Sequence, residues 1–136
     1  MVPNIKSHIS QYFLSRSSYS RPAWGESSSF CNSYGFEMLT LETLEEQQSF
    51  FMQLESSTYL RSLNYVWYWV DSIRVGPTTD WYWTKSGKKI SFPIPWLSYQ
   101  PDNYEGIEYC LNISKLTMNA KFGYADAKCD NNSNVA

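Results

Sequence analysis

The sequence is poor in the residues and patterns from which several common functional sites are built. It has one histidine, His8, and none of its three cysteines has the close spacing of a zinc site or a redox pair. Its formal net charge of -2 gives no basic surface for nucleic acid. No stretch approaches the roughly 20 apolar residues of a membrane-spanning helix. These absences argue against a Cys–His nucleophile, a nucleic-acid partner and a membrane span.

Aromatic residues are abundant, with six Trp, eleven Tyr and seven Phe in 136 residues. Large rings fill the cores of small domains, and they also stack on sugars. The length suits one domain, so we interpret 1–136 as a single domain with its core at about 12–135 and an N-terminal extension at 1–11. Five tryptophans are predicted to lie in the core: Trp67, Trp69, Trp81, Trp83 and Trp96.

The cysteines favour an oxidising compartment. Cys31, Cys110 and Cys129 fit a disulfide framework better than a metal site, and the odd count leaves one of them without a partner in the chain. Two N-glycosylation triplets, at Asn112 and Asn131, agree with secretion. The first fifteen residues lack the apolar core of a signal peptide. We therefore expect a secreted, extracellular protein whose signal peptide is not present in this sequence.

Two helices are expected in the N-terminal half. The first follows Ser20 as a cap and Pro22 in its first turn and ends at Gly35, with Cys31 facing inward. The second starts at Thr43-Leu44-Glu45-Glu46, which matches the capping box that satisfies free N–H groups at a helix start. It ends at Ser56-Ser57, and its buried side is predicted to comprise Leu44, Phe50, Phe51, Met52 and Leu54.

Strand character dominates the rest of the chain. A first, N-terminal strand is expected around Ile9 to Phe13, and later strands at 65–70, 81–83 and 108–113. Three prolines between Ser91 and Asn103 interrupt ladder pairing, so this segment is predicted to be a long ordered loop. Helices first and strands afterwards indicate an α+β fold, two helices packed on small antiparallel sheets.

Oxygen donors crowd the end of that loop. Gln100 and Asp102 flank Pro101, and a cis peptide bond there would turn both side chains towards one point, with Glu108 arriving from the next strand. Calcium takes about six to eight oxygen ligands of this kind, and sugar hydroxyls can complete its shell. The alternative is a solvated loop whose side chains only cap turns. A glycosidase pair of Glu105 and Glu108 fits less well, because residues three apart on a loop need not face one cleft.

Taken together, these features resemble the C-type lectin family, and within it the arthropod secreted lectins. The resemblance extends from about Tyr12 to Val135. The matching residues, in the order and approximate spacing of the family, are Cys31, Met38 to Glu42, Trp69, Trp83 to Gly87, Trp96, Gln100 to Asp102, Cys110 and Cys129.

The resemblance implies a C-type lectin-like fold with a disulfide between Cys110 and Cys129. The second family disulfide would join Cys31 to a cysteine just past Val135, so Cys31 is expected to be unpaired in a sequence that is truncated at its C-terminus. The expected cofactor is Ca²⁺, and the ligands that the family pattern places on this chain are Gln100, Asp102, Glu108 and Asp126.

The family pattern also indicates what is bound. Its Gln-Pro-Asp form goes with galactose-type sugars, and Tyr104 stands where galactose binders often carry a stacking Trp. The expected function is therefore non-enzymatic, calcium-dependent binding of carbohydrate in glycan or microbial recognition, as part of innate immunity. Ala125 departs from the family, which has an Asn ligand there. This gap favours the alternative, a metal-independent lectin-like module that binds a protein or lipid partner.

Overall fold

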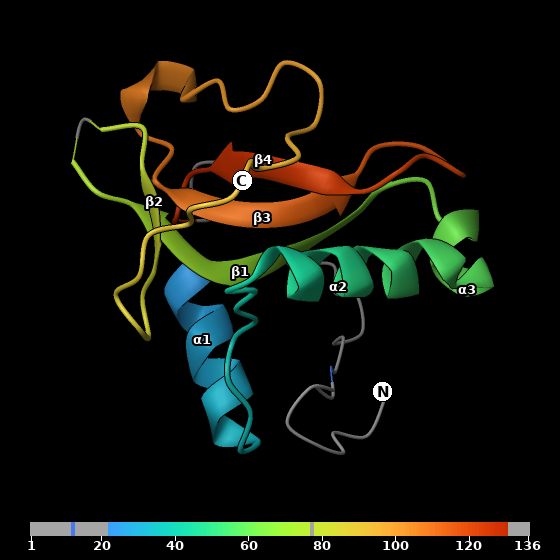
Figure 1. The fold of residues 1–136 in the computed structure, drawn as a ribbon, viewed down its shortest axis with the longest axis horizontal. Helices are drawn as coiled ribbons and strands as arrows, with labels where there is room; N and C mark the ends of the chain where they lie inside the picture. The colour runs from blue at the N-terminus through green and yellow to red at the C-terminus, as the bar shows by residue number, and fades with distance from the viewer. Residues whose placement is uncertain (1–11, 13–21, 77, 131–136) are drawn as a thin grey trace.

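A computed structural model of the chain describes residues 12, 22–76 and 78–130 (Figure 1). Within these residues the chain forms three α-helices, one short 3-10 helix and a four-stranded sheet. In chain order the elements are α1 (Trp24–Ser33), α2 (Leu44–Ser56), α3 (Thr58–Ser62), β1 (Val66–Arg74), β2 (Trp81–Trp83), η1 (Tyr104–Gly106), β3 (Cys110–Lys115) and β4 (Gly123–Ala127). The α+β prediction is confirmed. None of the helices in the described part of the chain is long and apolar enough to cross a membrane.

The sheet is antiparallel, with the strand order β2-β1-β3-β4. Its two central strands, β1 and β3, pair from Val66 opposite Lys115 to Ile73 opposite Cys110, with an irregularity between Trp69 and Ile73. Strand β4 forms an edge, and Asp126 lies opposite Leu111 on β3. The sheet thus holds Asp126 on a rigid strand next to the segment that follows β2.

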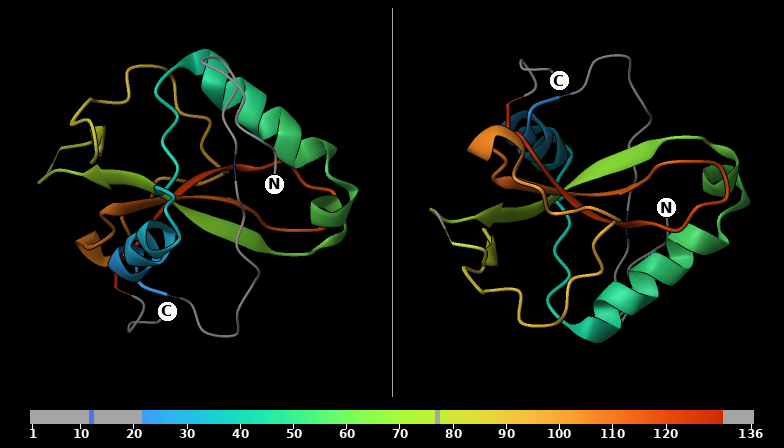
Figure 2. Two further views of the ribbon diagram at one scale, coloured as in Figure 1. Left: turned by 90° about the horizontal axis from the view of Figure 1, so that it is seen from below. Right: turned by 90° about the horizontal axis from the view of Figure 1, so that it is seen from above.

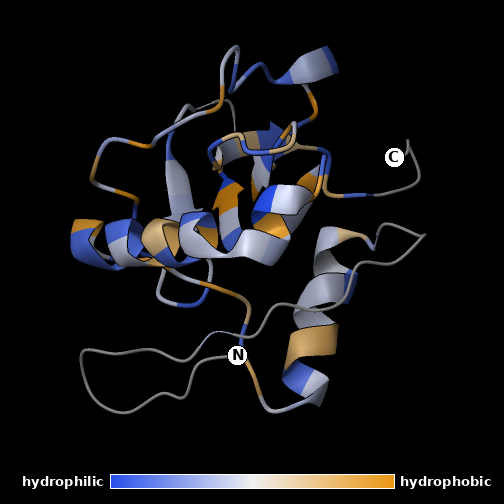
Figure 3. Ribbon diagram, turned by 90° about the vertical axis from the view of Figure 1, so that its right-hand side faces the viewer, coloured by the Kyte–Doolittle hydropathy of each residue, from blue (hydrophilic) through white to orange (hydrophobic). Residues whose placement is uncertain are grey.

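Helix α2 packs along the sheet and begins as its sequence predicts. The Thr43 hydroxyl accepts a hydrogen bond from Glu46 N (3.1 Å), and the Glu46 carboxylate accepts one from Thr43 N (3.3 Å). Hydrophilic and hydrophobic residues alternate along the helix (Figure 3), as expected when one side is buried. Its fully buried residues are Gln47, Phe50 and Leu54. The prediction was wrong for Leu44 and Met52, which are exposed, Met52 to 70%.

The other two helices differ from prediction. Helix α1 lies across the sheet from α2 (Figure 2) and starts at Trp24 with Ala23 as its N-cap, whereas the predicted cap, Ser20, lies outside the described residues. No residue of α1 is fully buried, so Cys31 is only partly covered. Helix α3 was not predicted. It begins because the Ser57 hydroxyl, expected only to end α2, accepts from Leu60 N (3.2 Å). The predicted N-terminal strand lies outside the described residues.

The core lies between α2 and the sheet. Thirteen buried side chains form it, among them Trp81 and Trp83 of β2 and Tyr124 of β4, and Trp96 packs against them. The core prediction was wrong for Trp67 and Trp69. Side chains alternate along a strand, so these two rings lie on the face opposite to the core residues Val66 and Val70. There they form an edge-to-face pair with centroids 5.0 Å apart.

Candidate functional site

The proline-rich segment after β2 is fixed to the edge of β4. Leu97 N donates to Tyr124 O (2.9 Å), and Tyr124 N donates to Pro95 O (2.9 Å). The segment lies so close to β4 that position 123 requires a glycine. A Cβ on Gly123 would lie 2.9 Å from a methyl carbon of Leu97 and 3.0 Å from Pro95 O. The Gln100–Pro101 peptide bond is cis, as the sequence suggested. This anchoring carries Gln100 and Asp102 to the end of β4, beside Asp126.

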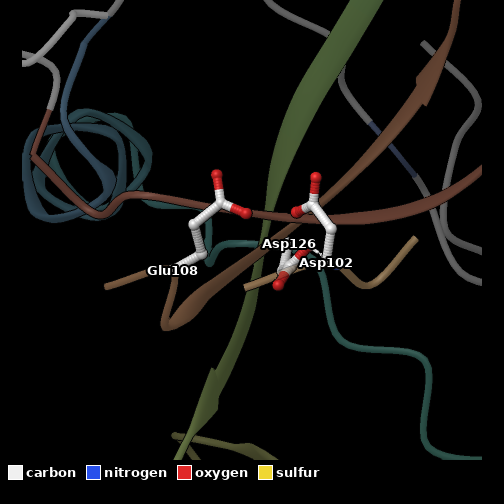
Figure 4. Close-up of side chains that lie close together, drawn as sticks. All are labelled: Asp102, Glu108 and Asp126. Atoms are coloured by element: carbon white, nitrogen blue, oxygen red, sulfur yellow. Dashed lines mark hydrogen bonds between the residues drawn. The ribbon is translucent and has the colours of Figure 1, made fainter. Parts of the chain in front are cut away.

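Three of the residues predicted as metal ligands come together at this point. Carboxylate oxygens of Asp102, Glu108 and Asp126 all lie within 4.8 Å of one another. Figure 4 shows the carboxylates of Asp102 and Glu108 turned towards each other, with Asp126 beside Asp102. Asp102 is exposed, Glu108 is half-buried and Asp126 is only 5% exposed. We call this group the acidic cluster.

Backbone N–H groups of the loop donate hydrogen bonds to two carboxylates of the cluster. Asp126 accepts hydrogen bonds from Asp102 N (3.1 Å) and Asn103 N (2.8 Å), one on each carboxylate oxygen. Glu108 Oε1 accepts from Tyr104 N (3.1 Å). Each carboxylate oxygen has a further lone pair, so these bonds orient the carboxylates and leave them able to bind a cation.

The electrostatics of the cluster favour a proton or a metal ion among the carboxylates. Burial, a hydrogen bond shared with Asp102 and the charges of Asp126 and Asp102 raise the pKa of Glu108 to about 8. Burial also raises the pKa of Asp126, and the nearby charge of Asp102 adds to the effect, although the loop N–H groups oppose it. Carboxyl groups this close repel one another when ionised, and a divalent cation would remove that repulsion.

The donor set fits calcium in its chemistry. Calcium prefers carboxylate and amide oxygens, and the cluster supplies three carboxylates. Gln100 Oε1 is buried and has no hydrogen-bond partner among the described residues, which is costly unless something binds it. Gln100, Asp102, Glu108 and Asp126 would hold the ion, which would neutralise the carboxylates and attract further oxygen ligands. Ala125, in the expected position on β4, adds no side-chain oxygen.

Arg74, at the end of β1, organises the same loop and was missed by the sequence analysis. It is 9% exposed. Its Nη2 donates to Asn103 Oδ1 (2.7 Å) and Glu108 O (2.9 Å), and its Nη1 donates to the carbonyls of Gly76 and Thr78 (both 3.3 Å). Its guanidinium also lies 4.3 Å from the ring centroid of Tyr109.

The effect of Arg74 on the cluster is indirect. Asn103 Oδ1 also accepts from Glu108 N (3.1 Å), so one amide oxygen joins the guanidinium to the backbone of a cluster residue. Arg74 therefore ties Asn103 to Glu108, two residues that flank η1 in the sequence. A single arginine gives no sequence signal of this role, because its partners are 29 and 34 residues away.

Two tyrosines of this loop, Tyr99 and Tyr104, have exposed side chains. Tyr104 opens η1 and is exposed, as a sugar-stacking ring must be. Tyr99, which the sequence analysis did not single out, is 95% exposed and has a positive φ of 68° next to the cis peptide bond. Glu105 pairs instead with Lys128 (3.1 Å), and its carboxylate is not among the three that gather. The geometry therefore gives no support to a Glu105–Glu108 glycosidase pair.

The cysteines and glycosylation candidates have separate outcomes. Cys110 and Cys129 form the disulfide that the resemblance implied. Cys31 is free, and burial raises the pKa of its thiol, which disfavours a reactive thiolate. Asn112 is 7% exposed in the central strand β3, a position that disfavours attachment of a glycan. Asn131 lies outside the described residues.

Comparison with known proteins identifies the fold. No family model and no curated protein matches the chain. Solved structures do. The carbohydrate-recognition domain of the mouse scavenger receptor C-type lectin is similar with a TM-score of 0.55 and 19% identity over 83% of this chain and 76% of that chain.

Two other C-type lectins give the same result. The lectin CEL-I from Cucumaria echinata has a TM-score of 0.55 and 20% identity over 79% of this chain and 76% of its own. The corresponding domain of cow CD23, solved in the presence of a GlcNAc2Man3 oligosaccharide, has a TM-score of 0.55 and 14% identity over 82% and 74%. The chain thus has the fold of C-type lectin carbohydrate-recognition domains.

Proposed function

We propose that this domain binds carbohydrate, of galactose type, through a calcium ion held by Gln100, Asp102, Glu108 and Asp126. The observation that carries the proposal is the meeting of three carboxylates within 4.8 Å. Gln100, two residues before Asp102, has a buried Oε1 without a hydrogen-bond partner in the described part of the chain. The fold, shared with carbohydrate-recognition domains, supports it. A secreted, non-enzymatic protein of glycan or microbial recognition, akin to arthropod lectins, is the corresponding biological role.

Sugar binding would use the exposed side of the cluster. Vicinal hydroxyls would complete the shell of the ion while exchanging hydrogen bonds with its ligand side chains. The preference for galactose rests on the order Gln100-Pro101-Asp102 and on the exposed Tyr104 ring, which can cover the apolar face of that sugar.

Calcium titration by calorimetry, followed by addition of galactose or mannose, tests the proposal. Saturable calcium binding, then heat that prefers galactose and disappears with EDTA, is expected. Asp102→Asn should abolish both signals, whereas Glu105→Gln, a change in the same loop outside the cluster, should abolish neither. Well-folded protein that binds no calcium at millimolar concentration would refute the proposed mechanism.

One observation favours a second function, a metal-independent module that binds a protein or lipid partner. Arg74 already supplies a cation to the loop, through bonds to Asn103 and Glu108, and Ala125 supplies no amide. The loop can therefore hold its shape without calcium. A partner that binds equally well in calcium and in EDTA would identify this function.

A further inference from the structure

Tyr99 occupies a turn position whose backbone favours glycine. Gln100 N donates to Leu97 O (2.9 Å), so residues 97–100 form a hydrogen-bonded turn. Tyr99 has a φ of 68° in this turn, whereas Ser98 has a negative φ. A positive φ at the third position alone is the pattern of a type II turn, in which glycine is preferred because a Cβ there is strained. Tyrosine at this position therefore destabilises the turn.

The side chain of Tyr99 does not compensate for this strain through packing. It lies outside the core and is 95% exposed, the highest value among the large hydrophobic side chains of the described residues. The other three residues of the turn line a cavity of about 200 Å³ beside β4, but Tyr99 does not belong to that lining. A residue that strains the backbone and contributes nothing to the core indicates a function other than folding.

The turn holds Tyr99 in a fixed place beside the proposed calcium site. Leu97 N donates to Tyr124 O (2.9 Å), which ties the turn to β4. Gln100, the next residue, is a proposed calcium ligand, and adjacent Cα atoms lie about 3.8 Å apart. A tyrosine ring has only two side-chain torsions, so it loses little conformational freedom when a ligand covers it. Tyr99 can therefore act as a contact surface at low entropic cost.

The surroundings of the ring suit a neutral sugar. The acidic cluster makes this loop negatively charged, which disfavours an anionic ligand. The ring offers an apolar face and one hydroxyl group, and the C–H groups of a pyranose can pack on such a face. Tyr104, at the start of η1, already covers the galactose in the proposed function. The ring of Tyr99 is then available to a neighbouring sugar residue.

We propose that Tyr99 contacts the sugar residue that is linked to the galactose at the calcium site. The proposal rests on the proposed calcium-dependent binding of galactose-type sugars and makes it more specific: the preferred ligand has at least two sugar residues. Tyr104 covers the galactose, and Tyr99 covers the residue joined to it. The strained turn then has a purpose, because its ring contributes to binding.

The test compares a monosaccharide with two disaccharides in calcium-saturated protein by calorimetry. Wild type should bind lactose or melibiose, which both end in galactose, about fivefold more tightly than methyl galactoside. Tyr99→Phe should keep this ratio. Tyr99→Gly should bring it near one without changing the affinity for calcium or methyl galactoside. Tyr59→Ala, which removes a ring that is 67% exposed on α3, is the matched control and should keep the fivefold ratio.

Urea unfolding adds a readout that a structural role for Tyr99 would reverse. Tyr99→Gly removes the ring and the strain together, so it should unfold at a urea concentration no lower than wild type. Tyr99→Ala also removes the ring but keeps a Cβ at positive φ, so it should unfold at a lower urea concentration than Tyr99→Gly. A Tyr99→Gly protein less stable than wild type would show that the ring serves the fold, which overturns the proposal.

The outcomes separate this proposal from the one it rests on. A ratio near one for both disaccharides in wild type, or a fivefold ratio that survives Tyr99→Gly, overturns the role of Tyr99 while galactose binding stands. Failure of methyl galactoside and both disaccharides to bind calcium-loaded wild type overturns the proposed function and this inference with it.

Discussion

Replacing Glu108 with glutamine should weaken calcium binding and, without calcium, stabilise the fold at alkaline pH. Burial and, to a smaller extent, the neighbouring Asp102 and Asp126 raise the pKa of Glu108 from 4.5 to about 8 in the folded protein. Between these two values the folded state binds the proton that the unfolded chain has lost. The free energy of unfolding of wild type therefore falls as the pH rises through this range. Glutamine has no proton to lose, so the variant avoids this decrease.

The size of the effect follows from the spacing of the carboxylates. Two unit charges 4.8 Å apart repel by about 1 kcal/mol in water and by about 3 kcal/mol at the effective dielectric constant near a protein surface. Asp102 is exposed, which lowers its share of the repulsion. We expect Glu108→Gln to unfold with the same free energy as wild type at pH 5, and to be about 1 to 3 kcal/mol more stable at pH 9.

Urea unfolding in EDTA at pH 5, 7 and 9 measures this difference, and calorimetry measures calcium binding. Glu105→Gln is the matched control, because Glu105 lies in the same loop but pairs with Lys128; it should keep the wild-type pH dependence and calcium affinity. Calcium binding to wild type at pH 7 should also release protons, seen as heat that varies with the buffer. A Glu108→Gln variant with wild-type pH dependence, or with undiminished calcium affinity, would refute the reasoning.

Three further changes have predictable effects. Arg74→Met removes a guanidinium that makes four hydrogen bonds, so calcium affinity measured by calorimetry should fall about tenfold, the equivalent of one charge-assisted bond; unchanged affinity would show that the loop keeps its shape without it. Reduction of the Cys110–Cys129 disulfide, which spans 19 residues, should lower the free energy of unfolding in urea by about 3 kcal/mol. Trp83→Ala, at a fully buried core position, should lower it by about 3 to 5 kcal/mol, whereas the exposed Met52→Ala should change it little.

Much of the fold could be predicted because its signals are local. The capping box at Thr43 and the aromatic strand Trp81–Trp83 depend on residues within a few positions. Strand β4 escaped prediction, since a five-residue strand containing Gly, Ala and Asp has little intrinsic strand preference. Its pairing with β3 and the bond between Tyr124 and Pro95 define it instead. The prediction that Trp67 and Trp69 lie in the core was wrong, because composition alone does not say which face of a sheet is covered.

The candidate site also combines residues that a local motif predicts with residues that it does not. Gln100, Asp102 and Glu108 lie within nine residues of one another, so their meeting could be expected from one motif. Asp126 was found only through the resemblance to a family. Arg74 was missed as a site residue, because its role depends on contacts with loop residues that are distant in the sequence.

Position 125 bears on how the proposed site can hold calcium. An amide side chain there would add an oxygen ligand for calcium, whereas alanine adds none. Because Arg74 fixes the loop through Asn103 and Glu108, calcium need not also supply the free energy that orders the loop. A site with fewer ligands can therefore still be shaped for its ion.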